Sequence, residues 1–461
     1  MVRLSEADAS FIAMEAANGV PYAPIPVAVY ERPWDDPSTA VHLHELMARL
    51  MPNMRRSIAS DRFSLALPRW EDVPGFDVQE NLQVLPAPGD GTLRAVLDFA
   101  QDWARLPIPA GTPPWRVVFF EDVTVAGVPG RMVGVSHVHH ALTDGQGAAA
   151  MAEHYYQWGP DEGLPELPPL VPSNSAGEPW ALWRDGWSSE GRKVGALLRN
   201  TGGRARWATK APTAAAARTR ELAQAMGRLA TQQGPSAPKS PLLRRTSDRS
   251  RFDHLSIDFQ ALRAGARTVG GRANDGFMAG VSLALQRYHR DHGASVDELR
   301  MGMPISTRAD ASFTGNELIG AIMGLPLLDD AAVAVKECGA LSRRYQDDKD
   351  MLWLSDRFRA LANRVPRSVF RRMISASLAS MDVSISNVNG VPLRHWVAGV
   401  EVIDTIPFLV GGPAVTIVLV SLADHASIGV ITCPEAIPDP EHLVDRLREG
   451  FEEVSGLAPG Y

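Results

Sequence analysis

Apolar residues recur along the first third of the chain with periods that predict alternating helices and strands. In 43–51, leucine and methionine return every three or four positions, which is the spacing of one buried helix face. β-Branched and aromatic residues dominate 115–120 and 132–138, and the turn-forming residues of 126–130 separate the two runs. The pattern therefore predicts a helix followed by two strands that are joined through a tight turn.

The last part of the chain alternates between the same two periods. The patterns predict a strand at 252–259, a helix at 274–289 and an amphipathic helix at 440–454. Two apolar runs, 414–420 and 427–432, flank a short polar turn and predict a hairpin. Helix and strand signals are mixed in both halves, which predicts an α/β protein.

Between these halves lies a segment of different character, residues 174–250. It holds 14 Lys and Arg against 5 Asp and Glu, and its alanine-rich part at 213–231 has a helical composition. A stretch with Gly and Pro follows near 232–241, which predicts a flexible hinge. We therefore expect an N-terminal domain at 1–173, a basic helical connector at 174–250 and a C-terminal domain at 251–461.

The composition is that of a globular protein of 461 residues, a length that exceeds one hydrophobic core and suits two domains. The formal net charge is −7, so nucleic acid is not an expected partner. Cys338 and Cys433 are the only cysteines of the sequence, too few for a disulfide framework, which favours a reducing cytosol. The sequence also lacks a P-loop, a dinucleotide-binding fingerprint and a G-x-S-x-G nucleophile elbow, which argues against nucleotide hydrolysis, a dinucleotide cofactor and an α/β-hydrolase.

The sequence predicts neither a signal peptide nor a transmembrane helix. Acidic residues occupy the positions near the N-terminus where the apolar part of a signal peptide would lie. The longest uncharged run, 405–423, is interrupted by Pro407 and by the Gly-Gly-Pro at 411–413, so two buried strands are the better interpretation. We expect a cytoplasmic protein.

Three histidines fall within four residues at the end of the second predicted strand: His137, His139 and His140. Strand alternation puts His137 and His139 on one face and His140 on the other. Three interpretations are open: satisfied side chains of the core, a metal site with Asp144 as a further ligand, or general-base catalysis. The metal interpretation is the weakest, because no H-E-x-x-H motif or cysteine cluster accompanies these residues. A neutral imidazole, with an ordinary pKa near ~6.5, can take a proton from an alcohol at physiological pH.

The segment from His139 to Gly145 reads His-His-Ala-Leu-Thr-Asp-Gly and resembles the HHxxxDG motif of the CoA-dependent acyltransferase superfamily. Chloramphenicol acetyltransferase-like enzymes and nonribosomal peptide condensation domains share that motif. Nearly the whole chain resembles one branch, the bacterial wax ester synthase/acyl-CoA:diacylglycerol acyltransferase family. The segments that carry this resemblance are Leu4-Ser5-Glu6-Ala7-Asp8-Ala9-Ser10-Phe11, Pro68-Arg69-Trp70, Phe76-Asp77, Pro113-Pro114-Trp115 in place of PLW, Asn274-Asp275, Pro304-Ile305-Ser306-Thr307-Arg308, Gly315-Asn316 and Ser386-Asn387-Val388-Asn389-Gly390-Val391-Pro392, in which Asn389 replaces a proline.

The resemblance implies a role for the residues of the histidine motif. His140 is the expected general base, which deprotonates the acceptor hydroxyl and returns the proton to the leaving CoA thiolate. His139 is expected to shape the end of the strand. Asp144 is expected to turn away from the substrate and pair with Arg308, and a simple helix cap is the alternative. Gly145 lets the backbone approach closely, where a Cβ would crowd the loop.

The resemblance also implies roles for residues outside that motif. Asn274 is the expected donor to the oxyanion of the tetrahedral intermediate, and a helix-capping role is its alternative. Asp275 is expected to be structural. Pro113 and Trp115 are expected to line or support the substrate tunnel.

The fold implied by the resemblance is a two-domain α/β sandwich of the chloramphenicol acetyltransferase type, with the active site in a tunnel between the domains. Ser386 and Asn387 are expected where the chain crosses between the halves. The implied reaction transfers an acyl group from acyl-CoA to a hydrophobic alcohol, which forms triacylglycerol from diacylglycerol or a wax ester from a long-chain alcohol. Acyl-CoA is then a co-substrate, and neither a metal ion nor a tightly bound cofactor is expected. Two alternatives are a stand-alone condensation-type acyltransferase and a catalytically silent lipid-surface protein that retains the fold.

The basic connector also carries a pattern typical of interfacial anchors. Trp180, Trp183 and Trp187 fall near helical spacing among basic side chains. Basic amphipathic helices with tryptophan bind anionic lipid surfaces, which predicts peripheral contact with a membrane or a lipid droplet. The alternative is that these tryptophans pack onto the protein's own domains.

Overall fold

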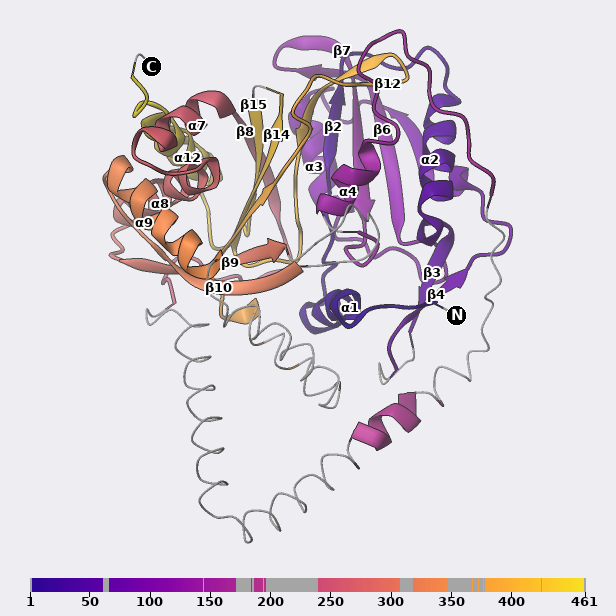
Figure 1. The fold of residues 1–461 in the computed structure, drawn as a ribbon, viewed down its shortest axis with the longest axis horizontal. Helices are drawn as coiled ribbons and strands as arrows, with labels where there is room; N and C mark the ends of the chain where they lie inside the picture. The colour runs from indigo at the N-terminus through magenta and orange to yellow at the C-terminus, as the bar shows by residue number, and fades with distance from the viewer. Residues whose placement is uncertain are drawn as a thin grey trace.

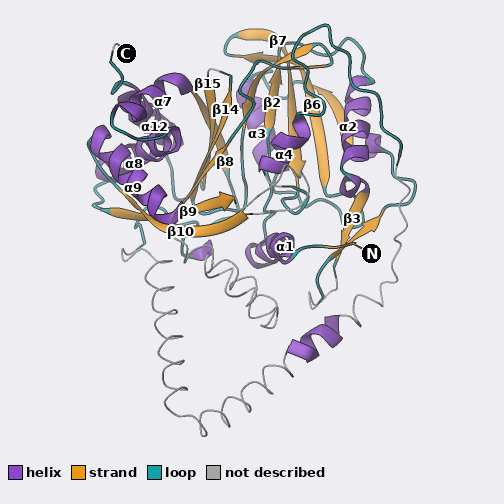
Figure 2. Ribbon diagram, in the orientation of Figure 1, coloured by secondary structure: helices purple, strands orange, loops and turns teal. Residues whose placement is uncertain are grey.

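The computed structural model places most of the described residues in two lobes that lie side by side (Figure 1). These residues are 2–60, 66–143, 145–170, 184, 186–193, 195, 239–306, 318–346, 367, 372, 376, 378–423 and 425–459. Each lobe is a sandwich in which helices pack on a β-sheet (Figure 2). The predicted α/β class is therefore confirmed.

The N-terminal lobe is organised around a sheet with the strand order β12-β13-β2-β7-β6-β5. Its strands are β2 (Val27–Tyr30), β5 (Leu82–Pro86), β6 (Trp115–Val125), β7 (Val128–Val138), β12 (Trp396–Val397) and β13 (Val400–Ile406). The hairpin formed by β6 and β7 confirms the predicted pair of strands. It places Trp115 opposite Val138, so the start of β6 lies beside the end of β7.

Alternate residues of β6 pack against helices on opposite faces of the sheet. Val117 and Phe119 belong to the hydrophobic cluster that includes α2 (Thr39–Leu50), and this helix confirms the one predicted at 43–51. Val118 and Phe120 belong to the cluster that includes α3 (Leu93–Trp103). The period of two along the strand thus buries both faces of the sheet.

Shorter elements complete the N-terminal lobe. They are the strands β1 (Val2–Arg3), β3 (Arg56–Ala59) and β4 (Arg69–Asp72), the 3-10 helices η1 (Pro52–Arg55) and η2 (Val78–Asn81), and the α-helices α1 (Glu6–Asn18) and α4 (Gly145–Ala152). A capping box begins α1, because Ser5 Oγ accepts the Asp8 N–H at 3.0 Å and Asp8 Oδ2 accepts the Ser5 N–H at 3.3 Å. The helix ends at Gly19, whose φ of 71° is a left-handed conformation that glycine adopts readily.

The C-terminal lobe is built on a second sheet with the strand order β10-β9-β11-β14-β15-β8. Its strands are β8 (Arg251–Asp258), β9 (Glu298–Ser306), β10 (Leu318–Pro326), β11 (Val383–Val388), β14 (Val415–Leu422) and β15 (His425–Thr432). The helices α7 (Phe259–Thr268), α8 (Ala273–Asp291), α9 (Ala331–Gln346) and α12 (Pro440–Ser455) lie on one side of it (Figure 1). The strand, the hairpin and the two helices predicted for this half are confirmed, with small shifts at their ends.

Part of the C-terminal half of the sequence completes the N-terminal sheet. After β11 the chain crosses to the other lobe, where β13 pairs with β2, and it then returns as β14. The predicted C-terminal domain, 251–461, therefore contributes strands to both lobes. The end of the predicted connector, 174–250, also differs from expectation, because Ser240 and Leu243 are buried in the C-terminal lobe. Most of that connector lies outside the described residues.

The two lobes contact each other where α3 faces β8. Arg94 Nη1 lies 2.9 Å from Asp253 Oδ1, and the Phe252 N–H donates to Gln101 Oε1 at 3.1 Å. The rings of Phe252 and Phe408 stack with their centroids 4.3 Å apart. Polar and apolar contacts thus join the lobes along this seam.

Candidate active site

The chain leaves β7 at Val138 and turns through the two motif histidines. The His139 N–H donates to Pro114 O at 2.9 Å, and the Leu142 N–H donates to His139 O at 2.9 Å. The short helix α4 then begins at Gly145. The motif is therefore a turn between a central strand and a helix, and a backbone hydrogen bond ties it to the residue that precedes β6.

The His140 side chain is buried against aromatic rings from the start of the chain. It is 7% exposed, and its ring stacks on Phe11 with centroids 4.1 Å apart and an interplanar angle of 13°. The centroid of the Tyr22 ring lies 5.8 Å from the centroid of the His140 ring. Burial raises the pKa of Tyr22 to about 12, so its hydroxyl keeps its proton at physiological pH. The His140 ring thus packs beside two aromatic rings from the start of the chain.

Both ring nitrogens of His139 have partners within the protein. Nδ1 accepts the Ala141 N–H at 2.9 Å, and Nε2 lies 3.3 Å from Glu15 Oε2. Because Nδ1 accepts a hydrogen bond, the proton of the neutral ring sits on Nε2, facing the carboxylate. The protein therefore holds the His139 ring through both of its nitrogens.

His137 is a neutral side chain of the core. It is 1% exposed, and its Nδ1 accepts a hydrogen bond from Arg116 Nη2 at 3.0 Å. The same Nη2 donates to Trp103 O at 2.9 Å. Burial lowers the pKa of His137 to about 3, and the nearby Arg116 and His139 add to the effect. Of the interpretations open for the three histidines, the structural one describes His137.

Asn274 lies in the first turn of α8, in the C-terminal lobe. Its Oδ1 accepts a hydrogen bond from Asn387 Nδ2 at 3.2 Å, and its own Nδ2 donates to Met278 Sδ at 3.5 Å. The capping alternative does not describe this arrangement, since Arg272 is the N-cap residue of the helix. Asn387, on β11, therefore fixes which way the Asn274 amide points.

Asp275 occupies a structural position beside Asn274. Its Oδ2 accepts the Arg272 N–H at 2.8 Å, and the residue is 2% exposed. A carboxylate in the first turn stabilises a helix, because it satisfies a free backbone N–H group and opposes the positive end of the helix dipole. The carboxylate also approaches α9, where a Cβ added at Gly339 would lie 3.1 Å from Oδ2.

Trp115 and Pro113 lie in the core of the N-terminal lobe. Trp115 is 1% exposed, and its Nε1–H donates to Met54 O at 2.8 Å. The Trp115 N–H donates to Pro113 O at 2.8 Å. Because Pro114 between them accepts the His139 N–H, this segment supports the histidine turn through the backbone.

Two residues of the predicted site, Asp144 and Arg308, lie outside the described residues, so their pairing stays a prediction. In the described part of the chain, no group of three or more His, Cys, Asp or Glu side chains could hold a metal ion. Of the motif residues that the sequence predicted for the site, the structure therefore describes His139, His140 and Gly145.

Sequence reasoning assigned no role to two residues that contact the site. Asn387 stands in one of the segments that carry the family resemblance, and this was its only signal. Glu15 had a weaker signal, its position four residues after Phe11, which places both side chains on one face of α1. Its contact with His139 joins residues far apart in the sequence.

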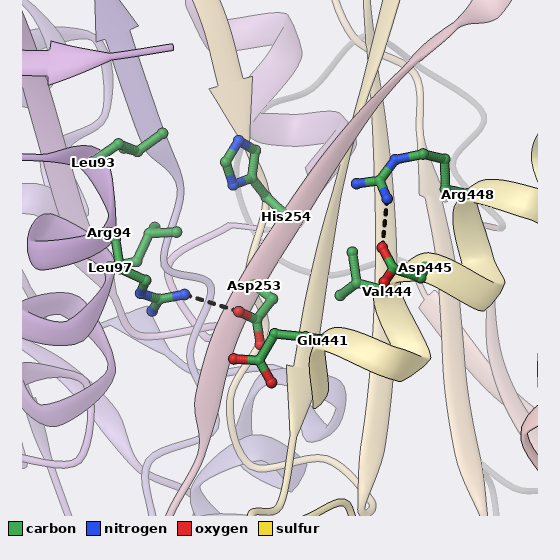
Figure 3. Close-up of a pocket in the computed structure, with 9 residues that line it drawn as sticks. All are labelled: Leu93, Arg94, Leu97, Asp253, His254, Glu441, Val444, Asp445 and Arg448. Atoms are coloured by element: carbon green, nitrogen blue, oxygen red, sulfur yellow. Dashed lines mark hydrogen bonds and ion pairs between the residues drawn. The ribbon is translucent and has the colours of Figure 1, made fainter. Parts of the chain in front are cut away.

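A groove of about 260 Å³ opens between α3, β8 and α12 (Figure 3). It is lined by Leu93, Arg94, Leu97, Asp253, His254, Glu441, Val444, Asp445 and Arg448. Its arginines pair with acidic neighbours, since Arg94 Nη1 lies 2.9 Å from Asp253 Oδ1 and Arg448 Nη1 lies 2.6 Å from Asp445 Oδ1. Neither His140 nor any other predicted catalytic residue lines the groove, and we assign it no part in the reaction.

Comparison with protein families supports the resemblance along most of the chain. A model described as the wax ester synthase/diacylglycerol acyltransferase catalytic domain matches residues 4–277, and the corresponding C-terminal domain matches 314–455. A relative from Mycobacterium tuberculosis named "Putative diacyglycerol O-acyltransferase" is 27% identical over 428 residues, which cover 90% of this chain and 84% of the relative. A relative from Mycobacterium bovis with the same description is 24% identical over 476 residues, covering 98% and 96%.

Solved structures share the fold at low sequence identity. The wax ester synthase/diacylglycerol acyltransferase from Marinobacter aquaeolei superposes with a TM-score of 0.66 at 19% identity, over 99% of this chain and 100% of that one. The first condensation domain of the calcium-dependent antibiotic synthetase superposes with a TM-score of 0.61 at 14% identity, over 100% and 98%. The predicted two-domain sandwich is therefore confirmed as the fold.

Proposed function

We propose that this chain, which belongs to the wax ester synthase/diacylglycerol acyltransferase family and is an acyl-CoA-dependent acyltransferase, uses His140 as its general base. The observation that carries the proposal is the engagement of the other motif histidine, since both ring nitrogens of His139 are occupied by Ala141 and Glu15. His140 is the remaining histidine of the HHxxxDG motif, and its ring stacks on Phe11.

In the proposed reaction, neutral His140 takes the proton of the acceptor hydroxyl as its oxygen attacks the thioester carbonyl of acyl-CoA. The tetrahedral intermediate then collapses with cleavage of the carbon–sulfur bond. The protonated imidazole returns its proton to the CoA thiolate, so the products are an ester and free CoA. These steps need no tightly bound cofactor, and acyl-CoA takes part as a co-substrate.

We further propose that the amide of Asn274 donates to the oxyanion of the intermediate. Asn387 supports this role, because its donation to Asn274 Oδ1 leaves Nδ2 as the donor side of the amide. Nδ2 carries two N–H groups, so one can donate to the oxyanion while the other donates to Met278 Sδ. His140 belongs to the N-terminal lobe and Asn274 to the C-terminal lobe. The substrates would then meet in a tunnel between the lobes.

The proposed acceptor is a hydrophobic alcohol, either a diacylglycerol or a long-chain alcohol. Thiol release from palmitoyl-CoA should be measured with dipalmitoylglycerol, hexadecanol and a short polar alcohol at equal concentration. We expect release to depend on one or both of the hydrophobic acceptors. If an aminoacyl thioester is added to the panel as a fourth acceptor, release with it alone would instead indicate a condensation-type enzyme. No release with any acceptor would favour the catalytically silent alternative.

We also propose that the exposed helical face around Trp187 contacts anionic lipid surfaces. Trp187 is 55% exposed, and Arg184 and Arg192 near it in the sequence are also exposed. Glu190 is by contrast 9% exposed, and its Oε2 accepts the Arg367 N–H at 3.1 Å. Trp180 and Trp183 lie outside the described residues. In the described part of the chain, no helix is long and apolar enough to cross a membrane, so such contact would be peripheral.

Vesicle flotation tests the lipid contact. The wild type should float with anionic phosphatidylglycerol liposomes at low salt, and less so as salt rises, because the electrostatic attraction is screened. Trp187→Ala should weaken flotation. Trp158→Ala is the matched control, since Trp158 is 49% exposed and lies outside this helical segment. Equal flotation of the wild type and Trp187→Ala, or none at low salt, would overturn the proposal.

A further inference from the structure

The last turn of α1 carries a carboxylate that holds two segments of the candidate active site. Glu15 Oε1 accepts the Tyr22 N–H at 2.8 Å, and Glu15 Oε2 lies 3.3 Å from His139 Nε2. The chain can return to this carboxylate because the left-handed Gly19 ends the helix. Glu15 thus links the helix, the loop that follows it and the histidine turn.

When the His139 ring is neutral, only one of its two tautomers suits both of these contacts. The Ala141 N–H donates to Nδ1 at 2.9 Å, so a proton on Nδ1 would set two donors against each other. The proton therefore sits on Nε2, where the Glu15 carboxylate is a matching acceptor. Glu15 and Ala141 together fix the tautomer and the orientation of the His139 ring.

The same helix also contacts the neighbouring His140. Phe11 lies four residues before Glu15, on the same face of α1, and its ring stacks on His140. Tyr22, whose N–H is bound by Glu15, has its ring 5.8 Å from His140 by centroids. Glu15 therefore holds the backbone of Tyr22, whose ring lies near His140, and the ring of His139, the residue that precedes His140 in the chain.

We propose that Glu15 is a positioning residue for acyl transfer, which acts on His140 through His139 and Tyr22. This inference rests on the proposed function of His140 as the general base. Glu15 would not touch the substrate. Its effect is to keep the His140 ring at one orientation during proton transfer, since small displacements of a catalytic group reduce the rate strongly.

Glu15→Gln tests the proposal because the two side chains have the same shape. If the amide oxygen accepts the Tyr22 N–H, the amide NH₂ faces the protonated Nε2 of His139, and two donors meet. If His139 changes its tautomer, the conflict moves to the Ala141 N–H. We expect kcat in the thiol-release assay to fall about tenfold with KM for palmitoyl-CoA unchanged, the pattern of an interaction that acts in the transition state.

Glu153→Gln is the matched control, since Glu153 is exposed immediately after α4 and should keep the wild-type kcat. The thermal midpoint of unfolding should be the same for both variants and the wild type. A wild-type kcat for Glu15→Gln would overturn the proposal. A fall in kcat that is matched by a large loss of thermal stability would also overturn it, in favour of a general structural role.

A double-mutant cycle with His139→Ala separates this inference from the proposed function. If Glu15 acts through His139, adding Glu15→Gln to His139→Ala should lower kcat by less than twofold further. Fully additive losses would show that the two residues act independently and would contradict the inference. The two claims fail separately. Retained activity in His140→Ala would refute the proposed general base, whereas the double-mutant cycle measures only the coupling between Glu15 and His139.

Discussion

At the scale of single residues, three neighbouring histidines differ in chemistry because they have different partners. His137 accepts a hydrogen bond from the half-buried Arg116, and His139 is held between a backbone N–H and Glu15. His140 is packed against Phe11. The partners come from β6 and α1, which meet the histidine turn only in the folded protein.

The burial of neutral His137 predicts a pH dependence of stability. Its pKa falls from 6.5 to about 3 on folding, so the unfolded chain binds the extra proton between these values. Stability is therefore lost as pH falls below about 6.5, by up to about 2 kcal/mol between pH 6.5 and 5. We expect His137→Gln, whose amide oxygen can still accept from Arg116, to lose less unfolding free energy in this window. Urea titrations at both pH values measure this, and equal losses in the two proteins would contradict it.

A second prediction at this scale concerns the amide pair Asn274 and Asn387. Removal of a donor to the oxyanion costs about 10²–10³ in kcat, so Asn274→Ala should fall in that range. Asn387→Ala should cost less, about tenfold, because it removes only the group that orients the amide. Single-turnover rates with saturating palmitoyl-CoA check both values. A larger loss for Asn387→Ala than for Asn274→Ala would show that Asn387 has the more direct role.

The histidine motif and the Asn-Asp pair could be recognised from the sequence because they are short and contiguous. The contacts of His139 could not be recognised in this way. Glu15 and His139 are far apart in the sequence and meet only in the folded protein, so no local pattern records their contact. The same holds for Asn387, which reaches Asn274 from a neighbouring strand of the C-terminal lobe.

At the scale of elements, the periodicity of the sequence predicted which helices and strands form, but it did not always predict which strands pair. The hairpin of β14 and β15 and the helix α12 follow from local patterns with a turn or a proline at their ends. The pairing of β13 with β2 joins opposite ends of the chain, and alternation alone does not choose between an edge of one sheet and of the other. The predicted division at 251–461 rested on the change in composition across 174–250, which carries no information on strand pairing.

Close packing between α8 and α12 supplies a prediction at the same scale. A Cβ added at Gly450 would lie 2.4 Å from Gly280 O, a backbone atom of the facing helix. We expect Gly450→Ala to lower the free energy of unfolding by about 1–3 kcal/mol, because the helices must move apart. Gly163→Ala is the control, since nothing lies within 4 Å of its added Cβ. Equal denaturant midpoints for the two variants would contradict tight packing here.

At the scale of the whole molecule, the proposed reaction needs groups from both lobes. In that proposal the N-terminal lobe supplies the histidine turn, and the C-terminal lobe supplies Asn274 with its partner Asn387. The crossing strands β12 and β13 and the seam between α3 and β8 hold the lobes together. The family resemblance predicted this arrangement because it spans both lobes, whereas composition and periodicity predicted only an α/β protein of two domains.

The central claim, that His140 is the general base of an acyl-CoA-dependent acyltransferase, is tested most directly by thiol release from palmitoyl-CoA by the full-length His140→Ala variant. The account predicts a loss of about 10²–10⁴-fold in rate with the acceptor that the wild type uses best, in a protein that unfolds at the wild-type temperature. A folded His140→Ala variant that keeps more than about a tenth of the wild-type rate would contradict the account, since loss of a general base costs far more.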